Sequence, residues 1–208
     1  MGDWRNFGSD LTKLVKYWQS SQQHAVSPST DISGSIHGTQ ALVVRGGDPY
    51  IRDLMRTITA SEANVAHPYN VIYGGEHVND LSSHPGVCIP IVSGPNTGNC
   101  STAAGRYQML DFTWSEQAKK YHPNLSGIWR WKNYSFEAEY QDIVVHNWLS
   151  DSHVWGTDIP LLLRQGKIDH VLKLLSGTWT RLGYGIETNF MSSYLRHIYQ
   201  NMLDEELS

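Results

Sequence analysis

The sequence predicts a mainly α-helical α+β domain with a small β-hairpin, preceded by an N-terminal helical extension. Apolar residues recur at helical spacings through much of the chain, and two short β-prone runs flank a Gly-Gly pair. A stretch rich in Ser, Thr, Gly and Gln separates the first helical pattern from the rest. With 208 residues, 40% of them hydrophobic, the chain can bury one core. We therefore expect an extension over residues 1–47 and a compact domain over 48–208.

The extension begins with apolar residues at helical spacing, which predicts an amphipathic helix over 3–19. Residues 20–47 have the composition of a linker, with one strand-like run at 41–44. We expect residues 1–47 to pack on the domain. The alternatives are that they bind a partner protein or are needed for secretion.

The domain opens with a helix that carries one acidic residue at an informative place. Asp48 and Pro49 favour a helix start, and an apolar stripe follows at Ile51, Leu54, Met55 and Ile58. Continued by four residues, the stripe reaches Glu62. A carboxylate on an apolar face, at the negative end of the helix dipole, is poorly solvated and favours its protonated form. Glu62 is thus a candidate general acid, and the alternative is a solvated residue beyond the helix end.

Next comes the predicted hairpin, with Gly74-Gly75 between the runs 71–73 and 76–80. Residues 84–100 form a long Pro/Gly-rich loop that contains both cysteines, Cys88 and Cys100. A disulfide between them would close a ring of about 13 residues and stabilise the fold by roughly 3 kcal/mol. Two free thiols in a reducing compartment are the alternative.

The second half is predicted to be helical, and its apolar stripes are assigned to the core. A helix opens with Gly105 to Gln108 and ends near residue 121; the others are expected over 136–148, 159–165, 168–179 and 190–202.

A series of short blocks resembles one known family. In order, they are Ser61-Glu62, His67 with Tyr69, Val71-Ile72 with Gly74-Gly75-Glu76, Asp80, His84-Pro85, Ser101-Thr102, Ala104-Gly105-Arg106-Tyr107-Gln108 and Gly183-Tyr184-Gly185. Over about residues 49–200, this order is similar to the lambda-type phage endolysins, which are lytic transglycosylases of the lysozyme superfamily. The resemblance implies a lysozyme-like domain with the hairpin beside a saccharide cleft.

The resemblance also implies the chemistry: cleavage of the β-1,4 bond between N-acetylmuramic acid and N-acetylglucosamine in peptidoglycan, with Glu62 as acid and then base. It implies no metal and no cofactor. By the same resemblance, loop 84–100 would be a lip over the cleft; Cys88 and Cys100 are an addition of this chain and would link the base of that lip. The substrate-binding residues that it implies are Tyr69, Tyr73, Asp80, Ser101, Gln108 and Tyr184. Asn70 and Ile186 depart from the family pattern, so their contacts are not carried over.

The kind of cleavage depends on whether a second carboxylate faces Glu62. A hydrolysing glycosidase ordinarily needs one, as a nucleophile or as a base for water. The candidates are Glu76, Asp80, Asp111 and Glu187. Asp80 is the best of them, and Glu187 suits the first turn of the last helix. None lies plainly opposite Glu62, so we expect a transglycosylase; the alternatives are a muramidase and a non-catalytic saccharide-binding protein of the same fold.

Other classes of function fit poorly. The formal charge of −4 gives no indication that the protein binds nucleic acid. No carboxylate follows His84-Pro85 as a zinc ligand would, and no helix follows either cysteine to lower its pKa as a cysteine peptidase requires. No apolar run is long enough for a membrane span, and from the first residues we expect no signal peptide. We expect synthesis in the cytoplasm and action on wall glycan strands after release or secretion, with an inhibitor or immunity protein as a candidate partner.

Overall fold

The computed structural model describes residues 39–123, 134–187 and 190–208, so the helix expected over 3–19 lies outside the described residues. These residues contain seven α-helices, two short 3-10 helices and a two-stranded antiparallel sheet, which confirms the predicted fold class. The elements are α2 (Pro49–Glu62), η2 (Pro68–Asn70), β1 (Ile89–Pro90), β2 (Cys100–Ser101), α3 (Asp111–Tyr121), α4 (Ala138–Ser150), α5 (Ser152–Trp155), α6 (Ile159–Arg164), α7 (Ile168–Leu175), η3 (Phe190–Ser193) and α8 (Leu195–Leu207).

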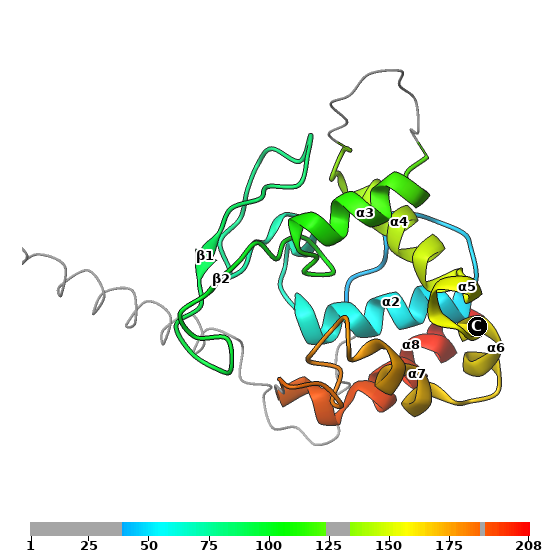
Figure 1. Ribbon diagram of the computed structural model, residues 1–208. Coiled ribbons are helices and arrows are strands. Elements are labelled where there is room, and N and C mark those ends of the chain that lie inside the picture. Colours follow the sequence, from blue (N-terminus) through cyan, green and yellow to red (C-terminus); the bar gives the residue numbers. More distant parts are fainter. Residues whose placement is uncertain (1–38, 124–133, 188–189) are drawn as a thin grey trace, which may run out of the picture. The chain divides into compact units, whose positions relative to one another are not determined.

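Helix α2 runs through the middle of the helices, with α3 and α4 on one side and α7 and α8 on the other (Figure 1). The Asp48 side chain caps it by accepting a hydrogen bond from the backbone N–H of Tyr50 at 3.0 Å. The predicted apolar stripe is buried, but so is the polar side of the helix. There, Arg52 and Arg56 form ion pairs with the α8 residues Glu206 and Glu205. Because α2 is held on all sides, the position of its last residue, Glu62, is fixed.

Residues 39–47 pack on the helices without forming the strand expected at 41–44. Side chains from elsewhere in the domain take up the backbone hydrogen bonds that a strand would need. Asp142 Oδ2 accepts from the N–H groups of Val43 at 3.0 Å and Val44 at 3.2 Å. Arg106 Nη1 donates to the carbonyl of Ala41 at 3.1 Å, and Leu42 is buried in the core. We therefore propose that the compact domain includes residues 39–47, ahead of the expected boundary at residue 48.

Two truncations test this boundary. Removal of residues 1–38 is expected to leave the unfolding temperature of the domain unchanged. Removal of 1–47 is expected to lower it by about 10 °C or more, because Arg106 and Asp142 then lose backbone partners inside the protein. Calorimetry of the two proteins side by side gives the answer, and equal unfolding temperatures would place the boundary back at residue 48.

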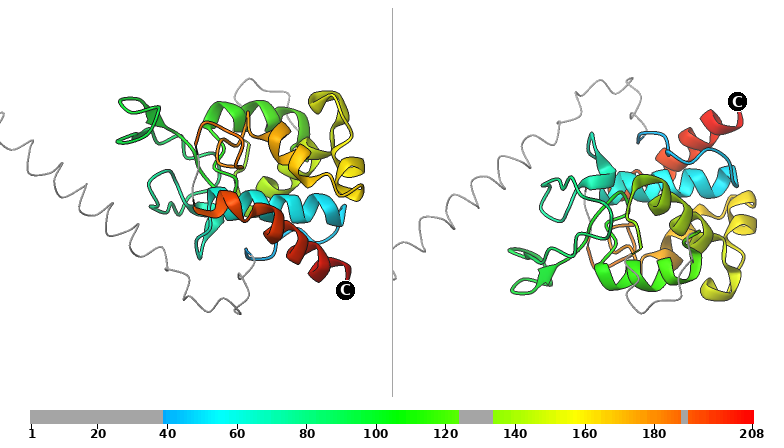
Figure 2. Two further views of the ribbon diagram at one scale, coloured as in Figure 1. Left: turned by 90° about the horizontal axis from the view of Figure 1, so that it is seen from below. Right: turned by 90° about the horizontal axis from the view of Figure 1, so that it is seen from above.

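The β-region, which comprises the predicted hairpin near Gly74-Gly75 and the strands β1 and β2, lies beside the C-terminal end of α2 (Figure 1). The predicted hairpin turn is present: Gly74 and Gly75 have φ of 88° and 93°, and the Ile72 N–H donates to the Glu76 carbonyl at 2.8 Å. It is held by an isolated bridge between Val71 and His77. The two-stranded sheet forms instead within the long loop, where β1 pairs with β2. In both views of Figure 2 this β1–β2 hairpin projects away from the helices.

The helix expected to open with Gly105 begins six residues later, at Asp111. Residues 104–109 form a tight turn closed by an Ala104–Met109 bridge. Gly105 has φ of 71°, and a Cβ there would lie 2.3 Å from Gln141 Oε1, so glycine is required. Gln108 follows with φ of 44°, an uncommon conformation for a residue with a side chain. This turn directs Gln108 into the site described below.

The C-terminal helices follow the predicted pattern except near residue 190. Helices α6 and α7 bury the expected stripes, and Trp179 is buried beyond the end of α7. Helix α8 begins at Leu195, after the 3-10 turn Phe190–Ser193. The sequence predicted that Glu187 lies in the first turn of the last helix, and this prediction is wrong. Glu187 lies in the loop that follows Trp179.

Candidate active site

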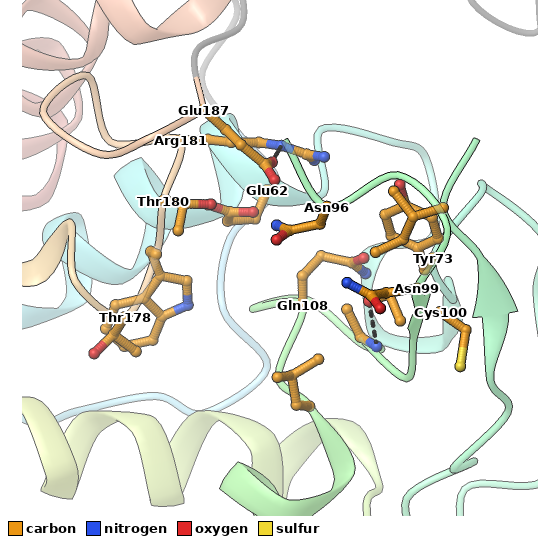
Figure 3. Close-up of a pocket in the computed structure, with 15 residues that line it drawn as sticks. Glu62, Tyr73, Asn96, Asn99, Cys100, Gln108, Thr178, Thr180, Arg181 and Glu187 are labelled. Atoms are coloured by element: carbon orange, nitrogen blue, oxygen red, sulfur yellow. Dashed lines mark hydrogen bonds and ion pairs between the residues drawn. The ribbon is translucent and has the colours of Figure 1, made fainter. Parts of the chain in front are cut away.

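A cleft of about 340 Å³ opens at the C-terminal end of α2 (Figure 3). Three segments meet at it: the end of α2, the loop 178–187, and the β-region with the turn 104–109. Its lining residues are Glu62, Tyr73, Ile91, Asn96, Asn99, Cys100, Ser101, Ala103, Gln108, Leu110, Thr178, Trp179, Thr180, Arg181 and Glu187. Polar and aromatic groups around a concave surface are typical of a small-molecule or saccharide site.

Glu62 provides the acidic group of the cleft. Burial raises the pKa of its carboxyl group from 4.5 to about 7, against the opposing effects of the Arg181 charge and of a hydrogen bond from the Arg181 backbone N–H. The negative charge of Glu187 raises this pKa further. Within the described residues, Glu62 Oε1 is buried and has no hydrogen-bond partner. A substantial fraction of Glu62 is thus protonated at neutral pH, as a general acid requires.

Neutral side chains form the wall across from Glu62. Figure 3 shows Tyr73, Asn99 and Gln108 on that side, whereas Arg181 and Glu187 lie on the same side as Glu62. Gln108 is fixed because its Nε2 donates to the carbonyl of Gly105 at 3.0 Å. Tyr73 is fixed by its backbone N–H, which donates to Ala103 at 2.8 Å. This wall offers amide and hydroxyl groups for hydrogen bonds to a ligand.

The structure brings three of the six expected substrate-binding residues together at the cleft: Tyr73, Ser101 and Gln108. Tyr69 is elsewhere, because its hydroxyl group donates to Asp142 at 2.9 Å in a buried network. Asp80 is exposed outside the cleft and accepts a hydrogen bond from the Ser82 N–H at 2.9 Å.

Tyr184 is the sixth of these residues. It is half exposed and does not line the cleft. It adjoins the loop residues that do, so a contact with a longer ligand stays a prediction.

Of the four candidate second carboxylates, Glu187 alone lines the cleft among the described residues. Asp111 instead accepts from the Thr102 hydroxyl at 2.9 Å, next to the start of α3. Glu187 forms an ion pair with Arg181, Nε to Oε2 at 3.2 Å. Sequence reasoning named Glu187 as a candidate second carboxylate but missed its partner Arg181, together with Thr178, Thr180, Asn96 and Asn99. The available signal was the neighbourhood of Gly183-Tyr184-Gly185 for Arg181 and the two threonines, and the cysteine ring for the two asparagines.

Cys88 and Cys100 form a disulfide with 5.4 Å between their Cα atoms. The ring that it closes supplies Ile91, Asn96 and Asn99 to the cleft, along with Cys100 itself. The disulfide therefore limits the conformations open to one lip of the cleft, which lowers the entropy that a ligand must remove.

Reduction of this disulfide is expected to raise KM for glycan more than it lowers kcat, because Glu62 lies on α2, outside the ring. The loss of loop constraint is also expected to destabilise the fold by up to about 3 kcal/mol. Kinetics on soluble glycan with and without reductant test this. The Cys88→Ser/Cys100→Ser double variant is the control, since it should not respond to reductant. Complete reduction is verified by thiol counting. An unchanged KM under that condition would show that the disulfide does not shape the cleft for its ligand.

The described part of the chain contains no group of three His, Cys, Asp or Glu side chains arranged to hold a metal ion. Within it, no helix is both long and apolar enough to cross a membrane.

Comparison with known proteins gives the family. A family model described as Endolysin matches residues 54–204, which is most of the chain. The structure of bacteriophage lambda lysozyme complexed with a chitohexasaccharide is similar at a TM-score of 0.55 and 24% identity, covering 76% of this chain and 96% of that one. A second structure, lysozyme from bacteriophage lambda, gives a TM-score of 0.52 at 19% identity, covering 78% and 97%. No curated protein matches the sequence significantly. The chain therefore belongs to the Endolysin family and has the fold of bacteriophage lambda lysozyme, as its sequence motifs predicted.

Proposed function

We propose that this protein is a lytic transglycosylase that cleaves the β-1,4 bond between N-acetylmuramic acid and N-acetylglucosamine in peptidoglycan. Membership of the Endolysin family supports degradation of the cell wall, and the saccharide bound by lambda lysozyme supports a glycan as ligand. The observation that carries the proposal is Glu62: a carboxyl group with a pKa of about 7 inside the cleft, facing a wall of neutral side chains.

The proposed reaction uses one acid and a hydroxyl group of the substrate. Glu62 gives its proton to the glycosidic oxygen as the bond from that oxygen to C1 of muramic acid breaks. The 6-hydroxyl oxygen of the same sugar closes onto C1, and the Glu62 carboxylate takes the hydroxyl proton. No water is consumed, and Glu62 ends protonated for the next cycle. The products are a free N-acetylglucosamine hydroxyl and a 1,6-anhydromuramic acid end.

Among the described residues that line the cleft, Glu187 is the carboxylate that a hydrolytic mechanism would use beside Glu62. A hydrolysing enzyme places its second carboxylate either ~5 Å from the acid as a nucleophile or ~6.5–9.5 Å away, across the sugar, as a base for water. Glu187 lies on the same side as Glu62 and is held by Arg181, a position that favours neither role. A muramidase that works through Glu187 is the second candidate function.

Digestion of purified peptidoglycan with mass analysis of the soluble products tests the proposal. A transglycosylase releases muropeptides one water lighter than those of a hydrolase. Products that carry only reducing muramic ends would favour the muramidase. Binding of the wall without any release of products would identify a saccharide-binding protein instead. We expect the reaction to take place in the cell wall or periplasm, after release or secretion of the protein.

A further inference from the structure

The loop 178–187 brings opposite charges together beside Glu62. Gly185 packs against the carbonyl of Thr180 so closely that a Cβ would lie 2.1 Å from that oxygen. This close approach folds the second half of the loop back on the first. Glu187 therefore reaches the guanidinium group of Arg181, six residues earlier, and pairs with it at 3.2 Å. Figure 3 shows the two side chains next to Glu62.

The backbone of Arg181 is anchored independently of its side chain. Its carbonyl accepts hydrogen bonds from the hydroxyl groups of Ser61 and Ser192, each at 2.8 Å. Replacement of the Arg181 side chain therefore leaves these anchors in place, and the charge of the side chain can be examined separately from the fold of the loop.

Arg181 poses a problem for a general acid. A cation next to a carboxyl group favours the ionised form, which cannot donate a proton. The Arg181 charge does act on Glu62 in this direction. The charged or titratable groups that line the cleft with Glu62, among the described residues, are Arg181, Glu187 and Tyr73. Of these, Glu187 alone can supply a charge that offsets the cation at neutral pH.

We propose that Glu187 is a positioning residue for the reaction. Its negative charge, paired with Arg181, offsets the effect of the guanidinium charge on Glu62, so that Glu62 stays available as an acid. Arg181 in turn holds the Glu187 carboxylate on the side of the cleft where Glu62 lies. The inference rests on the proposed function for its effect on catalysis. The electrostatic part concerns the free protein and does not depend on the substrate.

Opposite shifts from two charge-removing variants distinguish this role from a structural one. Glu187→Gln is expected to move the alkaline limb of the kcat/KM profile on soluble glycan to lower pH by about one pH unit, because Arg181 is then unbalanced. Arg181→Gln is expected to move it to higher pH. The double variant should return close to wild type, and Arg181→Lys, which keeps the charge, should shift less than Arg181→Gln. Glu116→Gln, at an exposed position on α3, is the matched control and should not shift.

Titration of the Glu62 carboxyl carbon by NMR, assigned by its loss in Glu62→Gln, measures the same midpoint without substrate. Shifts of the two single variants in the same direction, or no shift in either, would overturn the inference. Circular dichroism shows whether each variant is folded. If one of the two single variants does not fold, the shifts of the other and of Arg181→Lys still test the inference. Absence of soluble products from the wild-type digest would overturn the proposed function alone, because the NMR titration still tests the charge balance.

Discussion

Glu62→Gln is expected to lower the rate of wall cleavage by about 10²- to 10⁴-fold while saccharide binding survives, because a general acid typically contributes that factor. The amide keeps the shape of the carboxyl group and removes only its acidic proton. Release of soluble muropeptides measures the rate, and co-sedimentation with insoluble wall measures binding. Glu116→Gln changes the net charge equally and should keep full activity. More than a tenth of wild-type activity in Glu62→Gln would show that another residue is the acid.

The same substitution has a pH-dependent effect on stability. The pKa of Glu62 is about 7 in the folded protein and 4.5 as its ordinary value, so the folded state binds the proton more tightly. The stability that protonated Glu62 contributes is fully present below pH 4.5 and is lost as pH rises through 7. Above pH 7 the ionised group costs up to about 3 kcal/mol, which Gln avoids. Glu62→Gln is thus expected to be the more stable protein at pH 8, and urea unfolding at pH 4 and pH 8 tests this.

Arg106→Met is expected to lower the free energy of unfolding by about 3–5 kcal/mol, because several buried groups lose a charged hydrogen-bond donor and each such loss costs about 1–3 kcal/mol. Arg106 is fully buried and donates to the Thr59 hydroxyl at 2.8 Å and to the Tyr69 hydroxyl at 3.0 Å. Tyr69 in turn donates to Asp142, which is also fully buried. Burial raises the pKa of Asp142, and loss of the guanidinium group removes a positive charge that opposes this rise.

Urea unfolding followed by tryptophan fluorescence measures the effect of Arg106→Met. Arg196→Met is the matched control, because Arg196 forms an exposed ion pair with Asp169 at 3.0 Å that should contribute at most about 1 kcal/mol. Equal losses in the two variants would show that the buried network is not what holds residues 39–47 to the domain.

Local patterns in the sequence predicted what depends on local structure. Helix α2 was predicted from the Asp48 cap and from the apolar stripe that ends at Glu62. Glu62 is the last residue of α2, and its carboxyl group lines the cleft. The Gly74-Gly75 pair gave the hairpin turn. Each of these features depends on spacing or backbone conformation within a few residues, so it can be inferred without knowledge of the fold.

Features that depend on distant partners were not predictable in this way. Tyr69 matches a family motif, yet its hydroxyl group is committed to Arg106 and Asp142, far along the chain. Glu187 has the spacing of a helix start, but the contact of Gly185 with Thr180 turns it back toward Arg181 and the cleft. The sequence around Gly105 is compatible with a helix. Gly105 lies in a tight turn instead, because it packs against Gln141 of α4, and that contact cannot be inferred from the local sequence. In each case tertiary contacts decide between two locally acceptable structures.

Digestion of purified peptidoglycan in ¹⁸O-labelled water tests most directly the central claim, that Glu62 acts without a water nucleophile. We predict 1,6-anhydromuropeptides that contain no label at the new muramic end, because the 6-hydroxyl oxygen of the sugar forms the bond to C1. Reducing muramic ends that carry one labelled oxygen would contradict the claim and would identify a hydrolase, with Glu187 as the carboxylate to examine next.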